Sequence, residues 1–519
     1  MARGDTNILA IAAGVLPTRA MATYIFICLL TLIESLDATA IAVLVTVFIH
    51  TSLKREQADI ITAHRRRSER NLDRSDSIRN KKLALQSSLV FFIAGSVVAA
   101  TSPTIAQLLI GRSIQGIGAS GPVSLSVIIL TDIFPLQERA QWIGGLNAVW
   151  AFGSISGPLI GGSLVDASWR WVFWINVILC AICSFGVHFC LESRGSHAKL
   201  RSSLRDVDWT AIIFFVPSAL ACLLAITWGG SIYPWDSWKT ILPLMLGCIG
   251  LTGVAIYERY ICQSPMFQRS VFPDWTAISG HIGAFLHGIT LWLLVYYICL
   301  FYQSVRGYNP FETGVALLPE TLTVAPAAVG TGYLISKIGQ YRWALIVGGS
   351  LSTLGFGLFY LLDKNTSIGV MIIINMIPGL GLGILLPALA VTTQVSISRK
   401  DEGHAVAMLY LLRGAGQCVG VAIGGAIVTN RLRDQSLLQR SNSQISGERL
   451  AAVLIASGNS GETPDVVVQA LTDALRAVWV TGAVVAIIVT IVVSSARCPS
   501  LQDNEDKINL PEQEVVAVS

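Results

Sequence analysis

The chain has 519 residues, of which 53% are hydrophobic and 13% are charged, and its formal net charge is +4. Apolar runs of about 20 residues recur along it, which is the length that an α-helix needs to cross the hydrocarbon core of a bilayer. The composition therefore predicts an all-α polytopic membrane protein and leaves no soluble domain of useful size. The small net charge gives no support for a nucleic-acid partner.

Most of the ten cysteines fall inside apolar runs, including Cys180 and Cys183, so neither a disulfide framework nor a zinc site is expected. The sequence contains no metal-ligand cluster, no nucleophile motif and no phosphate-binding loop. We therefore expect no enzymatic activity and no cofactor or metal. The same lack of a Walker sequence argues against an ATP-driven pump.

The first apolar run covers about residues 21–48 and contains Glu34 and Asp37. A carboxylate at this depth costs several kcal/mol unless it faces a cavity or a partner, so both residues are candidates for a functional site. The alternative is that they lie near a helix end and are simply hydrated. That alternative is stronger for Glu34 than for Asp37.

The segment from His50 to Lys82 breaks this pattern. It contains ten Lys and Arg residues, and none of its apolar runs is longer than a few residues. Such a segment cannot form a membrane helix and is predicted to stay cytoplasmic.

Spans resume at 83–100 and 105–133, and the second of these contains Arg112 and Gln115. The two side chains lie three residues apart and therefore share one face of a helix. An arginine inside an apolar helix requires a carboxylate or a water-filled cavity. A purely structural ion pair near the membrane boundary is the alternative.

The apolar run from 142 to 164 is expected to form the next span. Gly153, Gly157 and Gly161 recur every fourth residue, and residues without a Cβ let a second helix backbone approach closely. Pro158 removes a backbone hydrogen bond and is expected to bend the helix beside Gly162. A simple packing face is the alternative reading.

The remaining spans are predicted from the same apolar periodicity. A basic linker over 191–208 precedes two spans, and a second group of six follows. Their expected ranges are 171–189, 209–228, 240–257, 277–302, 313–335, 343–362, 368–391, 405–428 and 478–493. Among polar residues in the second group, Glu320 and Arg413 are candidate cavity residues, ranked ahead of His281 and His287.

A long polar segment, 430–477, separates the last two spans. Thr463 to Asp465 is predicted to cap a short amphipathic helix that ends at Val478 and lies on the membrane surface. Asn365 begins the triplet Asn-Thr-Ser, a weak glycosylation signal. The tail from residue 499 is polar and predicted to be disordered.

Three motifs carry a resemblance to a known family. Arg112, Gln115 and Gly116 form an R-x-x-Q-G pattern, and the stretch from Trp150 to Gly162 is similar to the antiporter motif that ends in G-P-x-x-G-G. The stretch Ser168 to Asn176 resembles the opening of a sixth helix. Together they resemble the major facilitator superfamily, and most closely its fourteen-helix drug:proton antiporters of the fungal toxin and multidrug efflux type.

The resemblance implies two pseudo-symmetric helical bundles with two extra linker helices between them. About 13 of the 14 spans expected for this family are recognisable in the sequence. The second span is the one apparently missing. Two explanations are open: a natural variant that lacks the span, or a gene model that misread an exon, and the arginine-rich composition favours the latter. The expected divisions are 1–190 for the N-terminal bundle, with 51–82 in place of span 2, 191–262 for the linker and extra spans, 263–497 for the C-terminal bundle, and 498–519 for the tail.

By resemblance, the chain is expected to export small amphipathic organic compounds in exchange for protons, with Asp37, Glu34 and Arg112 as the proton-coupling residues. Its partners would be the substrate, protons and the lipid bilayer, with no nucleic acid, and it would act as a monomer. The plasma membrane is the expected location, with the vacuolar membrane as an alternative. Alternative functions are proton-coupled import of nutrients, vacuolar transport of basic amino acids, or a non-transporting paralogue or incomplete gene model.

Overall fold

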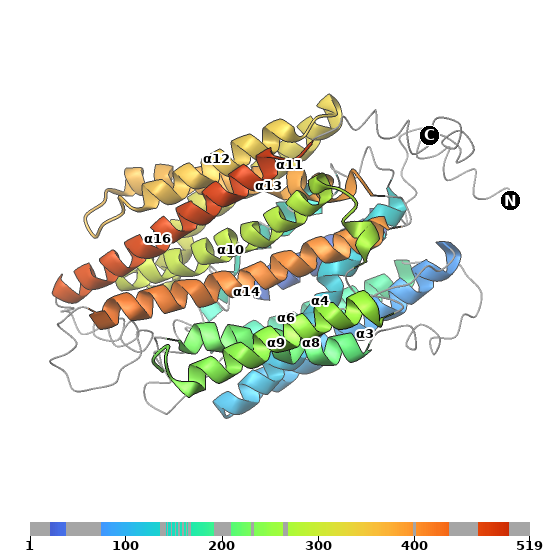
Figure 1. Cartoon of the computed structure of the whole chain (residues 1–519), viewed down its shortest axis with the longest axis horizontal. Helices are drawn as coiled ribbons and strands as arrows, with labels where there is room; N and C mark the ends of the chain where they lie inside the picture. Colours follow the sequence, from blue (N-terminus) through green and yellow to red (C-terminus); the bar gives the residue numbers. More distant parts are fainter. Residues whose placement is uncertain are drawn as a thin grey trace.

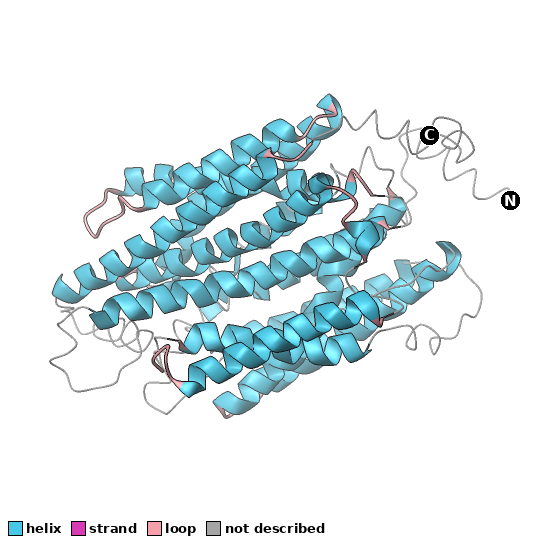
Figure 2. Cartoon of the chain, viewed as in Figure 1, coloured by secondary structure: helices cyan, strands magenta, loops and turns pink. Residues whose placement is uncertain are grey.

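The protein is represented by a computed structural model that describes residues 21–37, 74–134, 168–190, 209–229, 233–262, 268–397, 401–434 and 465–497, together with part of 142–164. Nearly all of these residues are helical (Figure 2). Within the described ranges the β structure is limited to one isolated bridge between Gly229 and Tyr233. The all-α expectation is therefore confirmed.

The helices are given in chain order. A helix over 21–37 comes first, and the described residues of 142–164 are also helical. The others are α3 (Arg74–Ala100), α4 (Ile105–Ile133), α6 (Arg170–Cys190), α8 (Trp209–Trp228), α9 (Trp238–Tyr260), the short 3-10 helix η1 (Arg269–Val271), α10 (Trp275–Ser304), α11 (Pro310–Ile338), α12 (Arg342–Phe359), α13 (Ile368–Gln394), α14 (Glu402–Asp434) and α16 (Asp465–Ser494).

The helices pack in two groups (Figure 1). Helix 21–37, α3, α4 and α6 share one buried apolar core, which includes Ile27, Leu89 and Cys183. Helices α10 to α14 and α16 share further buried apolar cores, and the largest of these includes Tyr302 and Trp479. The pair α8 and α9 lies beside α14, which also contacts α4. Helix α14 therefore lies where the two groups meet.

Nine helices among the described residues are long and apolar enough to cross a membrane. Their exposed side chains are largely apolar. On α9, for example, only 17% of the most apolar stretch of the helix is buried inside the protein. An apolar outer surface of this extent is stable in lipid rather than in water. The chain is a multi-pass membrane protein.

The start of α11 shows how local sequence fixes a helix terminus. Asn309 accepts a hydrogen bond from the Glu312 backbone N–H at 2.8 Å, and the Glu312 carboxylate accepts one from the Asn309 backbone N–H at 3.0 Å. Pro310 occupies the first turn, where its missing N–H costs nothing. The helix ends at Gly339, whose φ of 72° lies in the left-handed region that favours glycine.

The prediction of a short surface helix before the last span is wrong. Helix α16 runs without interruption from Asp465 to Ser494. Leu471, Leu475 and Val478 are buried in the core of the second group, so this stretch packs against protein and does not lie on a membrane surface. No Pro or Gly occurs between Val466 and Thr481 to end the helix.

The polar segment expected over 430–477 is correspondingly shorter. Helix α14 continues to Asp434 and α16 begins at Asp465. The last part of the basic segment expected over 51–82 is helical, because α3 begins at Arg74. Residues 51–73, the cap at 463–464, the tail from 499, and the motif residues Pro158 and Gly162 lie outside the described residues.

Candidate functional site

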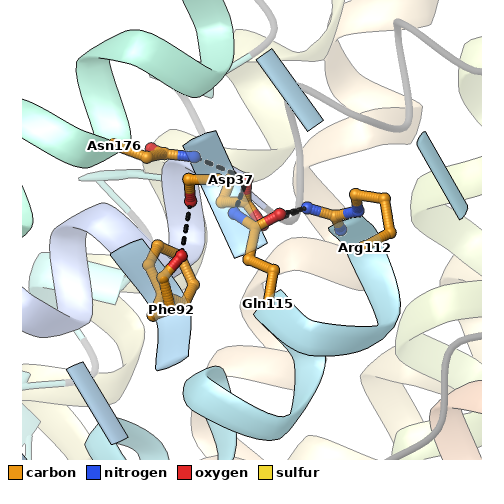
Figure 3. A network of polar contacts seen from close by, with 6 residues as sticks. Asp37, Phe92, Arg112, Gln115 and Asn176 are labelled. Carbon is orange, nitrogen blue, oxygen red and sulfur yellow. Dashed lines mark hydrogen bonds and ion pairs between the residues drawn. The ribbon is translucent and has the colours of Figure 1, made fainter. Parts of the chain in front are cut away.

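Asp37, the last described residue of helix 21–37, lies in a buried polar network with residues of two other helices (Figure 3). Its Oδ2 accepts a hydrogen bond from an Arg112 guanidinium N–H at 2.8 Å. Its Oδ1 accepts from the side-chain amides of Gln115 at 3.0 Å and Asn176 at 2.6 Å. Asp37, Gln115 and Asn176 are almost wholly buried. The carboxylate thus has three hydrogen-bond donors and one counter-charge.

Arg112 has further partners on its own helix and on α6. The same guanidinium nitrogen that bonds Asp37 donates to Gln115 Oε1 at 2.5 Å. Its carbon lies 5.9 Å from the centre of the Phe173 ring, within the range of a cation–π contact. An ion pair inside a protein is tolerated when both charges are held by additional hydrogen bonds. Here Gln115 bonds both charged groups, and Asn176 bonds the carboxylate.

Close packing of α3 and α4 positions the α4 residues of this network. A Cβ on Gly95 of α3 would lie 2.3 Å from the Gln115 backbone nitrogen. A Cβ on Gly118 of α4 would lie 2.2 Å from the Phe92 backbone nitrogen, and Phe92 appears beside the network in Figure 3. Side chains at these positions would push the helices apart, because real Cβ atoms do not approach so closely. The glycines therefore hold Gln115 at the level of Asp37.

Helix 142–164 packs against helix 21–37 at Ser35, two residues before Asp37. Ser35 Oγ donates a hydrogen bond to the Trp150 carbonyl oxygen at 2.5 Å. Gly153 faces the same helix, and a Cβ there would lie 2.7 Å from Ser35 Cβ. Gly157 and Gly161 are also buried. The glycine-containing helix is thus in direct contact with the helix that carries both candidate carboxylates.

The second group of helices faces this region through α10 and α14. Tyr296 of α10 interacts electrostatically with Asp37 and Arg112. Arg413 of α14 interacts electrostatically with Glu34, and its guanidinium carbon lies 5.7 Å from the centre of the Trp150 ring. Glu34 also interacts with Asp37. Charged groups of both helical groups therefore meet between helix 21–37, helix 142–164, α10 and α14.

Glu320, the other candidate, lies apart from this network. It is buried on α11 and interacts electrostatically with Cys299 and Tyr302 of α10. The Tyr302 hydroxyl oxygen accepts a hydrogen bond from the Asn375 side-chain amide on α13. The structure thus places this carboxylate inside the second group of helices.

The remaining candidates have simpler environments. His281 and His287 of α10 are buried, and each has one ring nitrogen within hydrogen-bond distance of a backbone carbonyl oxygen, 2.7 Å to Ala277 and 3.3 Å to Leu382. Gly116 follows Gln115 on α4. Asn365 is exposed in the turn between α12 and α13.

Sequence reasoning missed Asn176 as a member of the Asp37 network. Asn176 is a polar residue within the apolar first half of α6, and this is the signal that could have identified it. It also missed Ser35, Trp150 and Tyr296. The last two are aromatic residues in apolar spans, and nothing in the sequence distinguishes them from core residues that face only apolar neighbours.

Two groups of membrane helices, with charged residues packed at their junction, define the class of protein: a multi-pass membrane transporter. A family model, the Major Facilitator Superfamily, matches residues 74–421. The chain belongs to this superfamily.

Its relatives and its fold agree with that assignment. An MFS transporter of Phoma sp., named L2, is 35% identical over 492 residues, which cover 90% of this chain and 80% of the relative. An MFS efflux transporter of Aspergillus oryzae, named aclA, is 30% identical over 91% of this chain and 88% of its own length. The inward-facing, unoccupied structure of a bacterial homologue of the human lysosomal transporter Spinster aligns with a TM-score of 0.55 at 16% identity, covering 96% of this chain and 99% of that one, which supports the fold alone. The resemblance to the major facilitator superfamily and to its fungal efflux transporters is confirmed.

Proposed function

We propose that the chain exports small amphipathic organic compounds, such as drugs, toxins or secondary metabolites, in exchange for protons. The observation that carries this proposal is the ion pair between buried Asp37 and partly buried Arg112 inside the first helical group. The efflux function of the Aspergillus oryzae relative supports the outward direction. Transport would proceed by alternating access, with the two bundles 1–190 and 263–497 moving around a central site.

Asp37 is the proposed proton carrier. A proton on its carboxylate would remove the counter-charge of Arg112 and weaken Oδ1 as the shared acceptor for the amides of Gln115 and Asn176. A guanidinium cannot lose its own proton, so it must find another partner when Asp37 becomes neutral. Binding and release of one proton would therefore rearrange contacts between helix 21–37, α4 and α6, and a rearrangement of this kind can link proton movement to a change of access.

Helix 142–164 would transmit this rearrangement. It contacts helix 21–37 through Ser35 and Gly153, and through Trp150 it packs against the core of the second group and Arg413. A helical segment in contact with both groups can change their relative position when either side moves. Glu34, which interacts with both Asp37 and Arg413, would change the net charge at the junction of the two groups.

The test is transport by the purified chain in liposomes with an imposed pH gradient. The wild type should move a labelled amphipathic compound against its gradient while protons move in the opposite direction. Asp37→Asn should abolish movement that depends on the pH gradient, because the variant carries no titratable group at this position. Full pH-driven transport by Asp37→Asn would contradict the assignment of Asp37.

We further propose that the protein acts as a monomer in the plasma membrane and that Asn365 is a glycosylation site. Asn365 is exposed, as a modification site must be. A glycosidase-sensitive change in mobility that disappears in both Asn365→Gln and Ser367→Ala would support the site. An unchanged mobility of the wild type after glycosidase treatment would exclude it.

A further inference from the structure

Arg413 is a half-buried cation whose charge is only partly compensated. Its Nε atom is buried and has no hydrogen-bond partner among the described residues. No carboxylate in the described part of the chain lies within the 4.0 Å of its nitrogens that would define an ion pair, although Arg112 has such a partner in Asp37. Glu34 interacts with Arg413 only at longer range. The guanidinium therefore keeps unused hydrogen-bonding capacity at the junction of the two helical groups.

The backbone that carries Arg413 is held tightly against α10. A Cβ on Gly288 would lie 2.2 Å from the Arg413 carbonyl oxygen. Further along α14, a Cβ on Gly420 would lie 2.5 Å from the carbonyl oxygen of Ile289 on α10. Arg413 is thus presented by a rigid pair of helices, and rigid presentation lowers the entropy lost when a ligand binds.

The surroundings of Arg413 combine charge with an aromatic face. Trp150, from the other helical group, lies under the guanidinium at 5.7 Å. A cation–π contact of this kind contributes about 0.5–2 kcal/mol, which is less than the several kcal/mol needed to desolvate a charge. Tyr410, one turn earlier on α14, interacts electrostatically with Arg413 and Glu34. The site joins a planar cation to indole and phenol rings.

Glu34 and Arg413 differ in how they can meet the cost of burial. A carboxylate can take up a proton and become neutral, whereas a guanidinium stays charged at any accessible pH. His287 does not offer a second cationic donor. Its Nε2 faces the Leu382 carbonyl oxygen, an acceptor, so in the neutral ring this nitrogen donates and Nδ1 is left as an acceptor. The group that needs an external partner is Arg413.

We propose that Arg413 binds the acidic group of the transported compound, so that the substrates are amphipathic organic acids with a carboxylate, or an equally acidic enol, on an apolar ring body. A carboxylate matches the guanidinium through two parallel hydrogen bonds, and the ring body suits the indole of Trp150. Glu34 competes with the substrate for the same cation. This inference rests on the proposed export function and names its substrate class.

The test uses two probes that share a naphthalene ring and differ in charge, 1-naphthaleneacetate and 1-naphthaleneacetamide. Binding of each tritiated probe to the purified full chain gives an affinity ratio of acid to amide. The wild type should prefer the acid at least tenfold. Arg413→Gln should lower the ratio at least tenfold, and Arg413→Lys should restore part of it because a point charge remains without the planar fork.

Glu34→Gln provides a change in the opposite direction. Removing the competing carboxylate should raise the acid-to-amide ratio severalfold, a result that a damaged fold would not produce. An equal affinity of the wild type for both probes, a ratio unchanged in Arg413→Gln, or a ratio lowered in Glu34→Gln would each overturn the proposal.

Failure of the export function would look different. Liposomes containing the wild type would then expel neither probe under a pH gradient, although the preference for the acid in the binding experiment would persist. Failure of the substrate assignment would instead leave efflux of the amide in place with no preference for the acid.

Discussion

Ser35 and Trp150 join the first helix to the helix of residues 142–164: the Ser35 hydroxyl donates to the Trp150 carbonyl oxygen at 2.5 Å. Gly153 lies one turn further along, and a Cβ there would lie 2.7 Å from Ser35 Cβ and 2.9 Å from the Leu32 carbonyl oxygen. The contact therefore depends on the missing side chain at Gly153. The helix that carries Asp37 and the helix that reaches Arg413 are joined at this point.

Gly153→Ala should destabilise the protein. A backbone carbonyl cannot move aside as a flexible side chain can, so the two helices must separate, and overpacking of this kind costs about 1–3 kcal/mol. We expect a lower thermal unfolding midpoint in detergent and slower efflux. The larger Gly153→Val should have a stronger effect in the same direction.

Gly357→Ala on α12 is the matched control. It also introduces a methyl group at a glycine inside a helix, but a Cβ there meets nothing within 4 Å. Its unfolding midpoint should equal or exceed that of the wild type, since alanine favours helix more than glycine. Equal midpoints for Gly153→Ala and Gly357→Ala would show that the close approach at Gly153 does not limit stability.

The sequence predicted the fold in detail because hydrophobic periodicity and length specify membrane helices strongly. The expected ranges 105–133 and 209–228 coincide with α4 and α8. The error at α16 has a physical cause. Polar residues such as Thr472 and Asp473 lowered the mean hydropathy of the first turns. Only the three-dimensional packing shows that Leu471 and Leu475, on either side of them, face the core.

The site was harder to predict than the fold. Asp37 and Arg112 could be singled out because charges are costly inside a bilayer. Their pairing, and the contributions of Asn176 and Ser35, depend on which faces of separate helices meet. A single sequence does not contain that information, since helices 21–37, α4 and α6 are brought together only by tertiary packing.

The continuity of α16 can be tested at Leu471. The structure buries this side chain completely in the core of the second group. Leu471→Ala should therefore lower the free energy of unfolding by about 2–5 kcal/mol, as for other buried leucines. Gln469→Ala, two residues away and exposed, should change stability by no more than about 0.5 kcal/mol. A small effect for both variants would favour a separate helix on the membrane surface.

The capping box of α11 offers a second local test. Asn309→Ala removes the acceptor of the Glu312 backbone N–H and should cost about 1 kcal/mol. Asn309→Asp keeps an acceptor at the same place and adds a charge that favours a helix N-terminus, so it should retain stability. Thermal unfolding of both variants measures the difference. Equal losses in the two would mean that the side-chain cap does not stabilise this helix.

Asp37 and Arg112 should behave as one energetic unit. Removing one partner leaves the other charge buried without compensation, which costs about 3–5 kcal/mol for pairs of this kind. Asp37→Asn and Arg112→Gln should each lower the unfolding midpoint strongly. The double variant should lose less than the sum of the two, because it leaves neither charge behind.

Transport measurements separate this structural role from proton coupling. The double variant, which regains stability, should still lack pH-driven efflux because neither a titratable carboxylate nor its cation remains. Arg170→Gln provides the control: Arg170 lies on α6 near the network's Asn176, but its side chain is exposed and donates to the Ser102 carbonyl oxygen at 3.2 Å. It should keep pH-driven efflux. Additive losses of stability for Asp37→Asn and Arg112→Gln would show that the two charges are not coupled. Recovery of pH-driven efflux in the double variant would show that the proton is carried by another residue.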